Sequence, residues 1–267
     1  MTGRVLVVAG SDSGAGAGIQ ADIKTIAALG GYAMTAITAL TAQNTTGVQA
    51  VMAVPPDFVR RQMEAVLDDI GADCIKTGML HDGGVIDALV SVLESRAASV
   101  PLVVDPVMIS TSGTQLLDAY AVAVLQRRLI PRTTVLTPNL PEAEALTGMT
   151  LSDIDAVKRA AQALLDLGAR HVVLKGGHLP GPKVCDVFCG AGETVVIEGE
   201  RIETPHTHGT GCTLASAIAV GLAQGLAPLP AVRRARDYLA EAIRAAPALG
   251  KGHGPLGHMH VLQSPPK

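Results

Sequence analysis

Short apolar runs rich in Val and Ile alternate with longer segments of helical periodicity along most of the chain. This alternation is typical of βαβ units, in which a crossover helix joins two parallel strands. It predicts an α/β fold with a central, mainly parallel β-sheet flanked by helices on both faces. The predicted strands lie near residues 4–9, 33–39, 48–54, 73–77, 101–105, 133–137 and 170–175. The predicted helices lie near residues 17–29, 57–70, 83–96, 118–128, 141–147 and 152–167.

The last third of the chain departs from this alternation. Two β-prone runs, 184–189 and 193–203, flank a Gly-Ala-Gly-Glu turn, which predicts an antiparallel hairpin. Two helices are predicted near 210–225 and 229–246, and the Gly-, His- and Pro-rich tail from Lys251 is expected to be irregular. With no repeat and no linker-like stretch, the pattern predicts one domain over residues 1–267.

One helix start carries a more specific signal. Ser152 is followed three residues later by Asp155, an arrangement similar to a capping box. It predicts that the helix over 152–167 begins at Ser152.

Composition narrows the possible functions. Apolar residues make up 48% of the chain, charged residues 17%, and the net charge is -3, which excludes a disordered tail, a coiled coil and a strongly basic nucleic-acid binder. With 2% aromatic residues and no Trp, base-stacking surfaces have little to be built from, so a small-molecule partner is favoured. The first apolar run is too short for a signal peptide, and no run of 18 apolar residues predicts a membrane span. A cytoplasmic location is expected.

The four cysteines do not predict a disulfide framework or a zinc site. Cys74, Cys185, Cys189 and Cys212 include no CxxC pair and no nearby His at zinc-ligand spacing.

The first predicted loop, GSDSGAGAGIQAD over residues 10–22, joins a strand to a helix and is rich in small residues. It lacks the dinucleotide fingerprint, because Ile19 stands where the third glycine is needed, and it lacks the ending of a P-loop. Ligands of open α/β sheets bind at the carboxyl ends of strands, so we expect this loop to approach a ligand and Asp22 to face the crevice. The alternative is a tight turn without a ligand.

The segment TALTAQNTTG, residues 38–47, is expected to place Gln43 and Asn44 just past the end of a strand. A carboxamide offers an acceptor and two donors, so Gln43 can pair with a ring nitrogen and an exocyclic amine together, as on an aminopyrimidine. The alternative is a polar loop amide that bonds the neighbouring backbone.

Three further loops follow predicted strands and are expected to converge at the same edge of the sheet: KTGML (76–80), VVDPVM (103–108) and TPNLPEAE (137–144). They supply Asp105, Asn139 and Glu142, which carry oxygen ligands of the type that Mg²⁺ uses together with substrate phosphates and waters. Asp105 could instead cap a turn, and Glu142 could be an ordinary acid in the first turn of a helix.

Two features near the end of the predicted sheet favour anion binding. Lys175 ends a predicted strand as a point charge suited to phosphate, although a solvated lysine is the alternative. The segment HGTGC runs directly into a long apolar helix, and backbone N–H groups from Gly209 to Cys212 should form an anion site there. In that field a depressed thiol pKa is expected for Cys212, whereas a small buried side chain is the alternative.

The chain resembles the bacterial hydroxymethylpyrimidine/phosphomethylpyrimidine kinases of thiamine biosynthesis. The resemblance runs from about residue 4 to residue 260. Its motifs, in order, are AGSDSGAGAGIQAD, TALTAQNT, KTGML, VVDPVM, TPNLPEAE, LKGGH and HGTGCTLASAIA. It implies a ribokinase-like fold, a homodimer, and the use of ATP and Mg²⁺. The implied reaction phosphorylates 4-amino-5-hydroxymethyl-2-methylpyrimidine to its monophosphate and then to the diphosphate at one site.

The resemblance also implies roles for individual residues. Gln43 would read the aminopyrimidine edge, in a pocket lined by Gly10, Asp22 and Met79. Catalytic duties would fall to Gly209, Thr210, Gly211, Cys212 and Lys175. ATP would be bound by Lys175, Asn139 and Glu142, and the metal by Asp105 and Glu142.

Three positions differ from related kinases. Cys212 stands where sugar kinases of this fold carry a catalytic Asp. Ala15 and Gly257 stand where many relatives carry Gly and Asn, respectively.

Other functions remain open at this point. A pyridoxal kinase could share the fold and the anion site, although Cys212 in place of Asp argues against it. A hydroxyethylthiazole kinase is less compatible with the AQNT motif. A sensor that binds a pyrimidine without catalysis would not need the candidate residues for anion and metal contacts.

Overall fold

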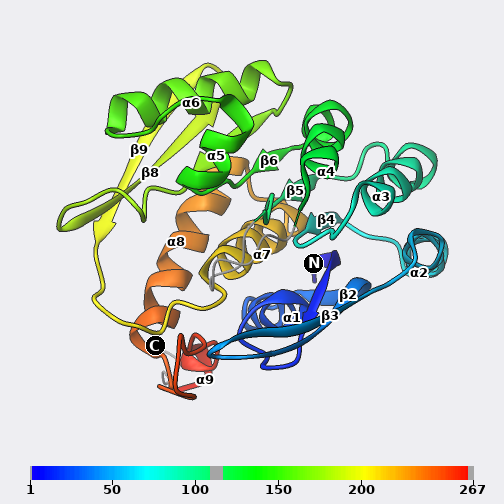
Figure 1. The fold of residues 1–267 in the computed structure, drawn as a ribbon, viewed down its shortest axis with the longest axis horizontal. Coiled ribbons are helices and arrows are strands. Elements are labelled where there is room, and N and C mark those ends of the chain that lie inside the picture. The colour runs from blue at the N-terminus through cyan, green and yellow to red at the C-terminus, as the bar shows by residue number, and fades with distance from the viewer. Residues whose placement is uncertain (1, 109–116, 264–267) are drawn as a thin grey trace.

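The computed structural model describes residues 2–108 and 117–263, which contain a nine-stranded sheet in the order β3-β2-β1-β4-β5-β6-β7-β8-β9 (Figure 1). The strands are β1 (Arg4–Asp12), β2 (Tyr32–Asn44), β3 (Gly47–Ala53), β4 (Cys74–Thr77), β5 (Leu102–Val104), β6 (Val135–Leu136), β7 (His171–Leu174), β8 (Lys183–Gly190) and β9 (Glu193–Glu200). The run from β2 through β1 and β4 to β7 is parallel, and β3, β8 and β9 are antiparallel. The predicted mainly parallel sheet is confirmed.

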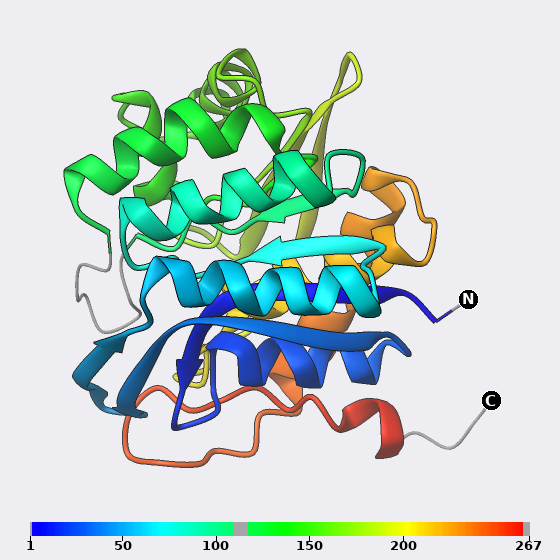
Figure 2. The same cartoon turned by 90° about the vertical axis from the view of Figure 1, so that its right-hand side faces the viewer.

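Helices cover both faces of this sheet. They are α1 (Gly18–Ala28), α2 (Pro56–Asp69), α3 (Gly83–Arg96), α4 (Ala119–Val124), α5 (Leu140–Thr147), α6 (Ile154–Asp166), α7 (Thr210–Ala223), α8 (Pro228–Arg244) and α9 (His260–Gln263). A π-helical turn (Leu125–Leu129) and a 3-10 turn (Ile130–Arg132) follow α4. Figure 2 shows α2 and α3 side by side on one face.

The side chains of β1 point alternately to the two faces of the sheet, which explains the two layers of the core. Leu6 and Val8 point into a cluster with α2, α3 and α6, whereas Val5 and Val7 point into a cluster with α1, α7 and α8. All four side chains are fully buried. Because successive side chains of a strand face opposite sides, one Val-rich strand serves both layers.

Two expected boundaries are wrong. β2 extends through Gln43 and Asn44, which pair with β3, so both residues lie in a hairpin and not past a strand end. Antiparallel pairing with β3 stabilises this extension, and a single-strand pattern does not reveal it. The N-cap of α6 is Asp153, whose side chain accepts a hydrogen bond from the Ala156 N–H, and not Ser152.

The C-terminal tail is also more ordered than expected, because it contains the short helix α9. It runs beneath α1 and the β2–β3 hairpin (Figure 2), where the His253 N–H donates to the Thr45 carbonyl at 2.9 Å. Within residues 2–108 and 117–263, no helix is long and apolar enough to cross a membrane.

Candidate active site

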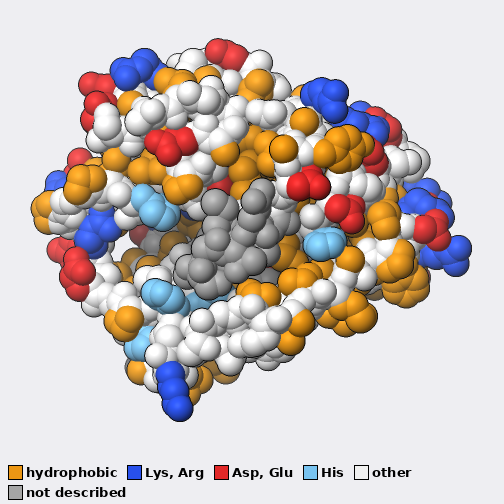
Figure 3. Space-filling view, viewed as in Figure 1, with side chains coloured by type: hydrophobic (Ala, Val, Ile, Leu, Met, Phe, Trp, Pro, Cys, Tyr) orange, Lys and Arg blue, Asp and Glu red, His pale blue; other side chains and the backbone are white. Residues whose placement is uncertain are grey.

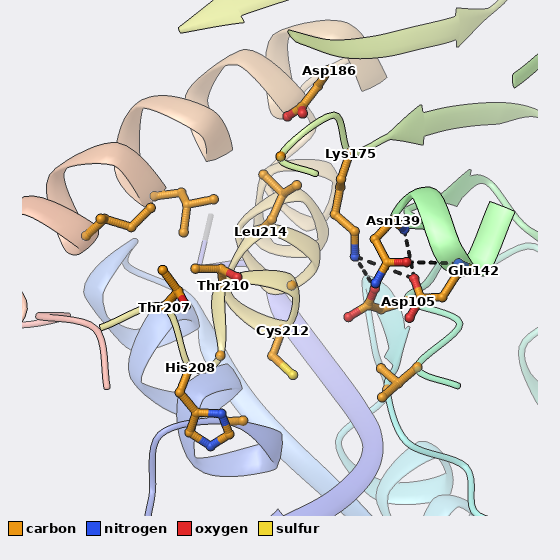
Figure 4. Close-up of a pocket in the computed structure, with 18 of the residues that line it drawn as sticks. Asp105, Asn139, Glu142, Lys175, Asp186, Thr207, His208, Thr210, Cys212 and Leu214 are labelled. Carbon is orange, nitrogen blue, oxygen red and sulfur yellow. Dashed lines mark hydrogen bonds and ion pairs between the residues drawn. The ribbon is translucent and has the colours of Figure 1, made fainter. Parts of the chain in front are cut away.

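A pocket of about 1530 Å³ opens at the carboxyl ends of β1 and β4 to β7, where the N-terminus of α7 meets them. It is the place that the topology of a parallel sheet favours for a ligand. The candidate residues that line it are Gly10, Gln43, Met79, Asp105, Asn139, Glu142, Lys175, Gly209, Thr210, Gly211 and Cys212. Figure 4 shows His208 on one side of the α7 N-terminus and, on the other side, Asp105, Asn139, Glu142 and Lys175.

The N-terminus of α7 is built from glycine for a steric reason. Gly209, its N-cap, has φ +87°, and a Cβ added there would lie 2.0 Å from the carbonyl oxygen of Gly16. In the described structure no side chain caps this helix, the Thr210 N–H donates to the Thr207 carbonyl at 3.3 Å, and Gly211 and Cys212 of the same turn line the pocket. Such an end attracts anions through its N–H groups and its dipole.

Cys212 lies in this first turn and lines the pocket, but its expected thiol chemistry is wrong. Burial raises the pKa of the Cys212 thiol to about 11. The nearby Lys76 ammonium lowers that pKa, and so does the Gly18 N–H, yet burial outweighs both. A thiolate loses more hydration than helix-end dipoles restore, so the side chain is a neutral thiol at pH 7.

Lys175 lines the pocket together with two carboxylates. Its Nζ lies 2.9 Å from Asp105 Oδ1 and 3.9 Å from Glu142 Oε2 (Figure 4). Burial alone would lower the pKa of this ammonium, but the carboxylates of Asp105 and Glu142 hold it above its ordinary value. A Cβ added at Gly211 would lie 3.3 Å from both Lys175 Nζ and Asp105 Oδ2, so these charges adjoin the first turn of α7.

Asn139 and Glu142 form a complete capping box at the start of α5. Asn139 Oδ1 accepts from the Glu142 N–H at 2.9 Å, and Glu142 Oε2 accepts from the Asn139 N–H at 2.8 Å. The structural alternative for Glu142, an acid in the first turn of a helix, is therefore present, and both residues also line the pocket. The box fixes their side chains against the Lys175 end of β7, where Asn139 and Lys175 form a parallel bridge.

The donor set fits a metal that arrives with phosphates. The described part of the chain holds no group of three or more His, Cys, Asp or Glu side chains placed to bind a metal ion by themselves. Asp105 and Glu142 nevertheless both lie close to Lys175, and Mg²⁺ commonly takes only one or two protein carboxylates.

The wall of the pocket that contains Gln43 is formed by β1, β2 and the loop after β4. A Cβ added at Gly10 would lie 2.5 Å from Met79 Cε, so this methionine side chain packs directly on β1 at Gly10. Thr38 Oγ1 holds the Met79 backbone by donating to its carbonyl at 2.6 Å. Gln43 reaches the same wall and contacts Thr41 and His208.

Asp22 does not line the pocket, and its expected place in the crevice is wrong. The residue is fully buried one turn into α1, where Asp22 Oδ1 accepts from Lys76 Nζ at 2.8 Å and from Ser216 Oγ at 2.6 Å. The side chain points inward because α1 packs against α7. Asp22 therefore belongs to a sealed ion pair in the core.

Two ion pairs near the pocket were missed by the sequence analysis. Asp12 binds His208, and Asp186 binds Arg236 while accepting the Gly176 N–H at 2.7 Å. The second pair holds the loop that follows Lys175. Asp12 lies within the first loop motif and His208 is the first residue of HGTGC, so their positions carried a signal, whereas nothing in the sequence pairs Asp186 with Arg236.

The sheet, the glycine-rich helix end and the lysine beside it define a small-molecule kinase of the ribokinase-like class. The phosphomethylpyrimidine kinase family model matches residues 12–257, and the chain belongs to this family. The chain is 47% identical to the hydroxymethylpyrimidine/phosphomethylpyrimidine kinase of Streptomyces coelicolor, covering 97% of this chain and 95% of that protein. These matches confirm the family and the type of enzyme predicted from the sequence.

Two other relatives extend the comparison. The chain is 52% identical, over 96% of its length, to a thiamine biosynthesis bifunctional protein of Geobacter sulfurreducens, of which it spans about half (52%). The solved ADP complex of Bacillus subtilis pyridoxal kinase has a TM-score of 0.90 and 35% identity, and the match covers 99% of this chain and 100% of that one. The ribokinase-like fold is thereby confirmed.

Proposed function

We propose that this chain transfers the γ-phosphoryl group of ATP to 4-amino-5-hydroxymethyl-2-methylpyrimidine, and that it then phosphorylates the monophosphate to the diphosphate. The observation that carries the proposal is one pocket with two unlike walls. The carboxamide of Gln43 lies on one wall, and Lys175 with the N-terminus of α7 lies on the other. The nucleotide complex of the related pyridoxal kinase supports the use of ATP.

The residues of the phosphate wall suit a reaction governed by position and charge. In phosphoryl transfer the acceptor oxygen bonds the γ-phosphorus, the bond from that phosphorus to the β–γ bridging oxygen breaks, and ADP leaves. The N–H groups of Gly211 and Cys212 and the Lys175 ammonium would stabilise the negative charge of the transferring group. The neutral thiol of Cys212 is not a standing base, so the acceptor hydroxyl would pass its proton to an oxygen of the phosphoryl group that it receives.

Asp105 and Glu142 would hold Mg²⁺ in this scheme, beside the phosphates. The ion would neutralise phosphate charge when bound. Lys175 bridges the two carboxylates, so its side chain keeps them oriented toward the same side of the pocket.

The edge strand β3 supports a homodimer. Met52 on β3 and Phe58 on the adjoining α2 are 62% and 57% exposed, and Leu40 and Val51 are exposed beside them. Figure 3 shows hydrophobic side chains along the edge of the molecule where β2, β3 and α2 lie. Exposed apolar edge strands are a liability for a monomer. A second copy of the chain would cover this strand, and Met52→Glu should then lower the mass measured by analytical ultracentrifugation.

The proposal is tested by ADP release with four acceptors: the pyrimidine alcohol, its monophosphate, pyridoxal and hydroxyethylthiazole. We expect turnover on both pyrimidines to exceed that on the other two. A preference for pyridoxal would replace the proposal with its nearest alternative, and binding of the pyrimidine without ADP release would indicate a sensor.

Gln43→Ala tests the acceptor wall. The loss of a bidentate contact costs about 1–3 kcal/mol, which is roughly five- to hundredfold in the KM for the pyrimidine. The KM for ATP should stay close to that of the wild type. The opposite pattern would move Gln43 out of the acceptor pocket.

A further inference from the structure

The carboxamide of Gln43 lies between two fixed neighbours. Gln43 Nε2 is placed 3.2 Å from His208 Nε2, and Gln43 Oε1 is placed 3.1 Å from Thr41 Oγ1. The oxygen and the nitrogen of a carboxamide occupy nearly the same space. Which end is the oxygen is therefore decided by the hydrogen bonds that the neighbours permit.

The neighbour at the first end offers a hydrogen. His208 Nε2 lies 2.9 Å from Asp12 Oδ2, which also accepts the Gly16 and Ala17 N–H groups at 3.1 and 2.9 Å. Burial alone would raise the pKa of Asp12, but hydrogen bonds from His208, Ala17 and Gly14 hold it below its ordinary value. An ionised carboxylate only accepts, so His208 Nε2 carries a hydrogen whether the ring is neutral or protonated. It cannot accept a hydrogen bond from an amide NH₂.

The neighbour at the second end offers a lone pair. The hydroxyl of Thr41 has a single hydrogen, and Thr41 Oγ1 lies 3.0 Å from the Ser11 carbonyl oxygen, to which it donates. The same oxygen can then accept from an amide NH₂ but cannot also donate fully to an amide oxygen. When the carboxamide of Gln43 is turned by half a rotation, its NH₂ donates to Thr41 Oγ1 and its oxygen faces the His208 Nε2 hydrogen, which Gln43 then shares with Asp12.

We propose that the buried pair of Asp12 and His208 sets the polarity of the Gln43 carboxamide, and thereby the direction in which the aminopyrimidine ring binds. This inference rests on the proposed function, because it takes Gln43 as the residue that reads the pyrimidine. After bonding its two neighbours, the carboxamide retains one oxygen lone pair at the His208 end and one N–H at the Thr41 end.

The polarity determines where the reacting group lies. Around the pyrimidine ring, the amine stands between the carbon that bears the hydroxymethyl group and the ring nitrogen. When the amine donates to the oxygen of Gln43 and the ring nitrogen accepts from its NH₂, the hydroxymethyl group lies on the His208 side. His208 directly precedes Gly209 at the N-terminus of α7, where the transferring group would be held. The opposite polarity would turn the hydroxymethyl group away.

The imidazole of His208 is held firmly enough for this positioning role. A Cβ added at Gly16 would lie 2.3 Å from His208 Cδ2, so the ring packs directly on the first loop. The backbone of His208 donates to the Gly254 carbonyl at 3.2 Å and forms a parallel bridge with Pro255. The C-terminal segment thus fixes the ring from the other side.

The test compares kcat/KM for the aminopyrimidine alcohol with that for the analogue that lacks the 4-amino group. His208→Leu removes the N–H while keeping an apolar side chain, and His208→Gln keeps an N–H near the position of Nε2. We expect His208→Leu to reduce the preference for the amino compound by about tenfold, the effect of one lost directional contact. His208→Gln should retain most of the preference, with the KM for ATP unchanged in both variants. The matched control is His253→Ala, an exposed residue of the same C-terminal segment.

A His208→Leu enzyme with an unchanged preference, or with equal losses on both acceptors, would overturn the inference. Should that variant not fold, Thr41→Val removes the partner at the other end and should also reduce the preference. A direct reading comes from long-range ¹H–¹⁵N spectra, assigned by comparison with His208→Gln. We expect hydrogen on Nε2, and hydrogen on Nδ1 alone would contradict the inference whatever the activity. A wild-type enzyme that phosphorylates no pyrimidine would instead overturn the proposed function.

Discussion

Two lysine–aspartate pairs of the same chemistry lie on either side of the first turns of α7, and their surroundings differ. Lys76 and Asp22 are fully buried, joined at 2.8 Å and sealed beneath the helix. Lys175 and Asp105 are joined at 2.9 Å, and they line the pocket. Burial alone would lower the pKa of either ammonium, but neighbouring carboxylates raise it in both cases. An ion pair is thus a candidate for function only where a ligand can reach it.

Because one pair is sealed in the core and the other lines the pocket, the two pairs should respond differently to mutation. A charge left alone in the core has no water to replace its partner, so it costs stability. A charge left alone at the pocket can be hydrated by water in the pocket. The loss of Lys175 would instead weaken the binding of a phosphate group there. Removing the cation of the core pair should therefore lower stability, and removing the cation of the pocket pair should lower activity.

The largest expected effect is on stability, in Lys76→Met. The variant leaves the carboxylate of Asp22 buried without its cation, which costs about 3–5 kcal/mol in the free energy of unfolding. Chemical denaturation followed by circular dichroism measures this loss. Adding Asp22→Asn removes the orphaned charge and should restore most of it, whereas a double variant as unstable as the single one would contradict the ion-pair account.

The next effect is on catalysis, in Lys175→Met. Removing the cation beside the transferring group should lower kcat/KM for ATP by about 10²–10³-fold. The midpoint of unfolding should move far less than in Lys76→Met. Lys158→Ala, an exposed lysine on α6, is the matched control and should leave both quantities unchanged. A Lys175→Met enzyme with wild-type kcat/KM would remove this lysine from the phosphate site.

The smallest effect concerns Cys212, which lies between the two pairs. Because burial raises the pKa of its thiol to about 11, alkylation by iodoacetamide should be slow at pH 7 and rise about tenfold per pH unit until that value. Peptide mass spectrometry assigns the modified residue, with Cys212→Ser as the control. If the alkylation rate of Cys212 had its midpoint below pH 9, the effect of the helix end on the thiol pKa would outweigh that of burial, which is what the sequence alone predicts.

The sequence predicted the sheet and, apart from Asp22, candidate residues that line the pocket. Both predictions succeeded for one physical reason. Parallel strands end at one edge, so Asp105, Asn139 and Lys175 could be brought together from three separate segments. The sequence could not place Asp22, because its direction depends on how α1 packs against α7. Nor could it supply the thiol pKa of Cys212, which depends on burial, or the contact of Asp12 with His208 across 196 positions.

The central claim is that the two pairs divide stability and catalysis between them, and the specific activity of two double variants tests it most directly. Lys76→Met with Asp22→Asn and Lys175→Met with Asp105→Asn each remove one lysine–aspartate pair, and the second also removes the cation beside Glu142. At equal concentrations of folded enzyme and limiting ATP, the first should keep its activity within a few-fold and the second should lose about 10²–10³-fold. Equal losses, or a greater loss in the first variant, would contradict this division.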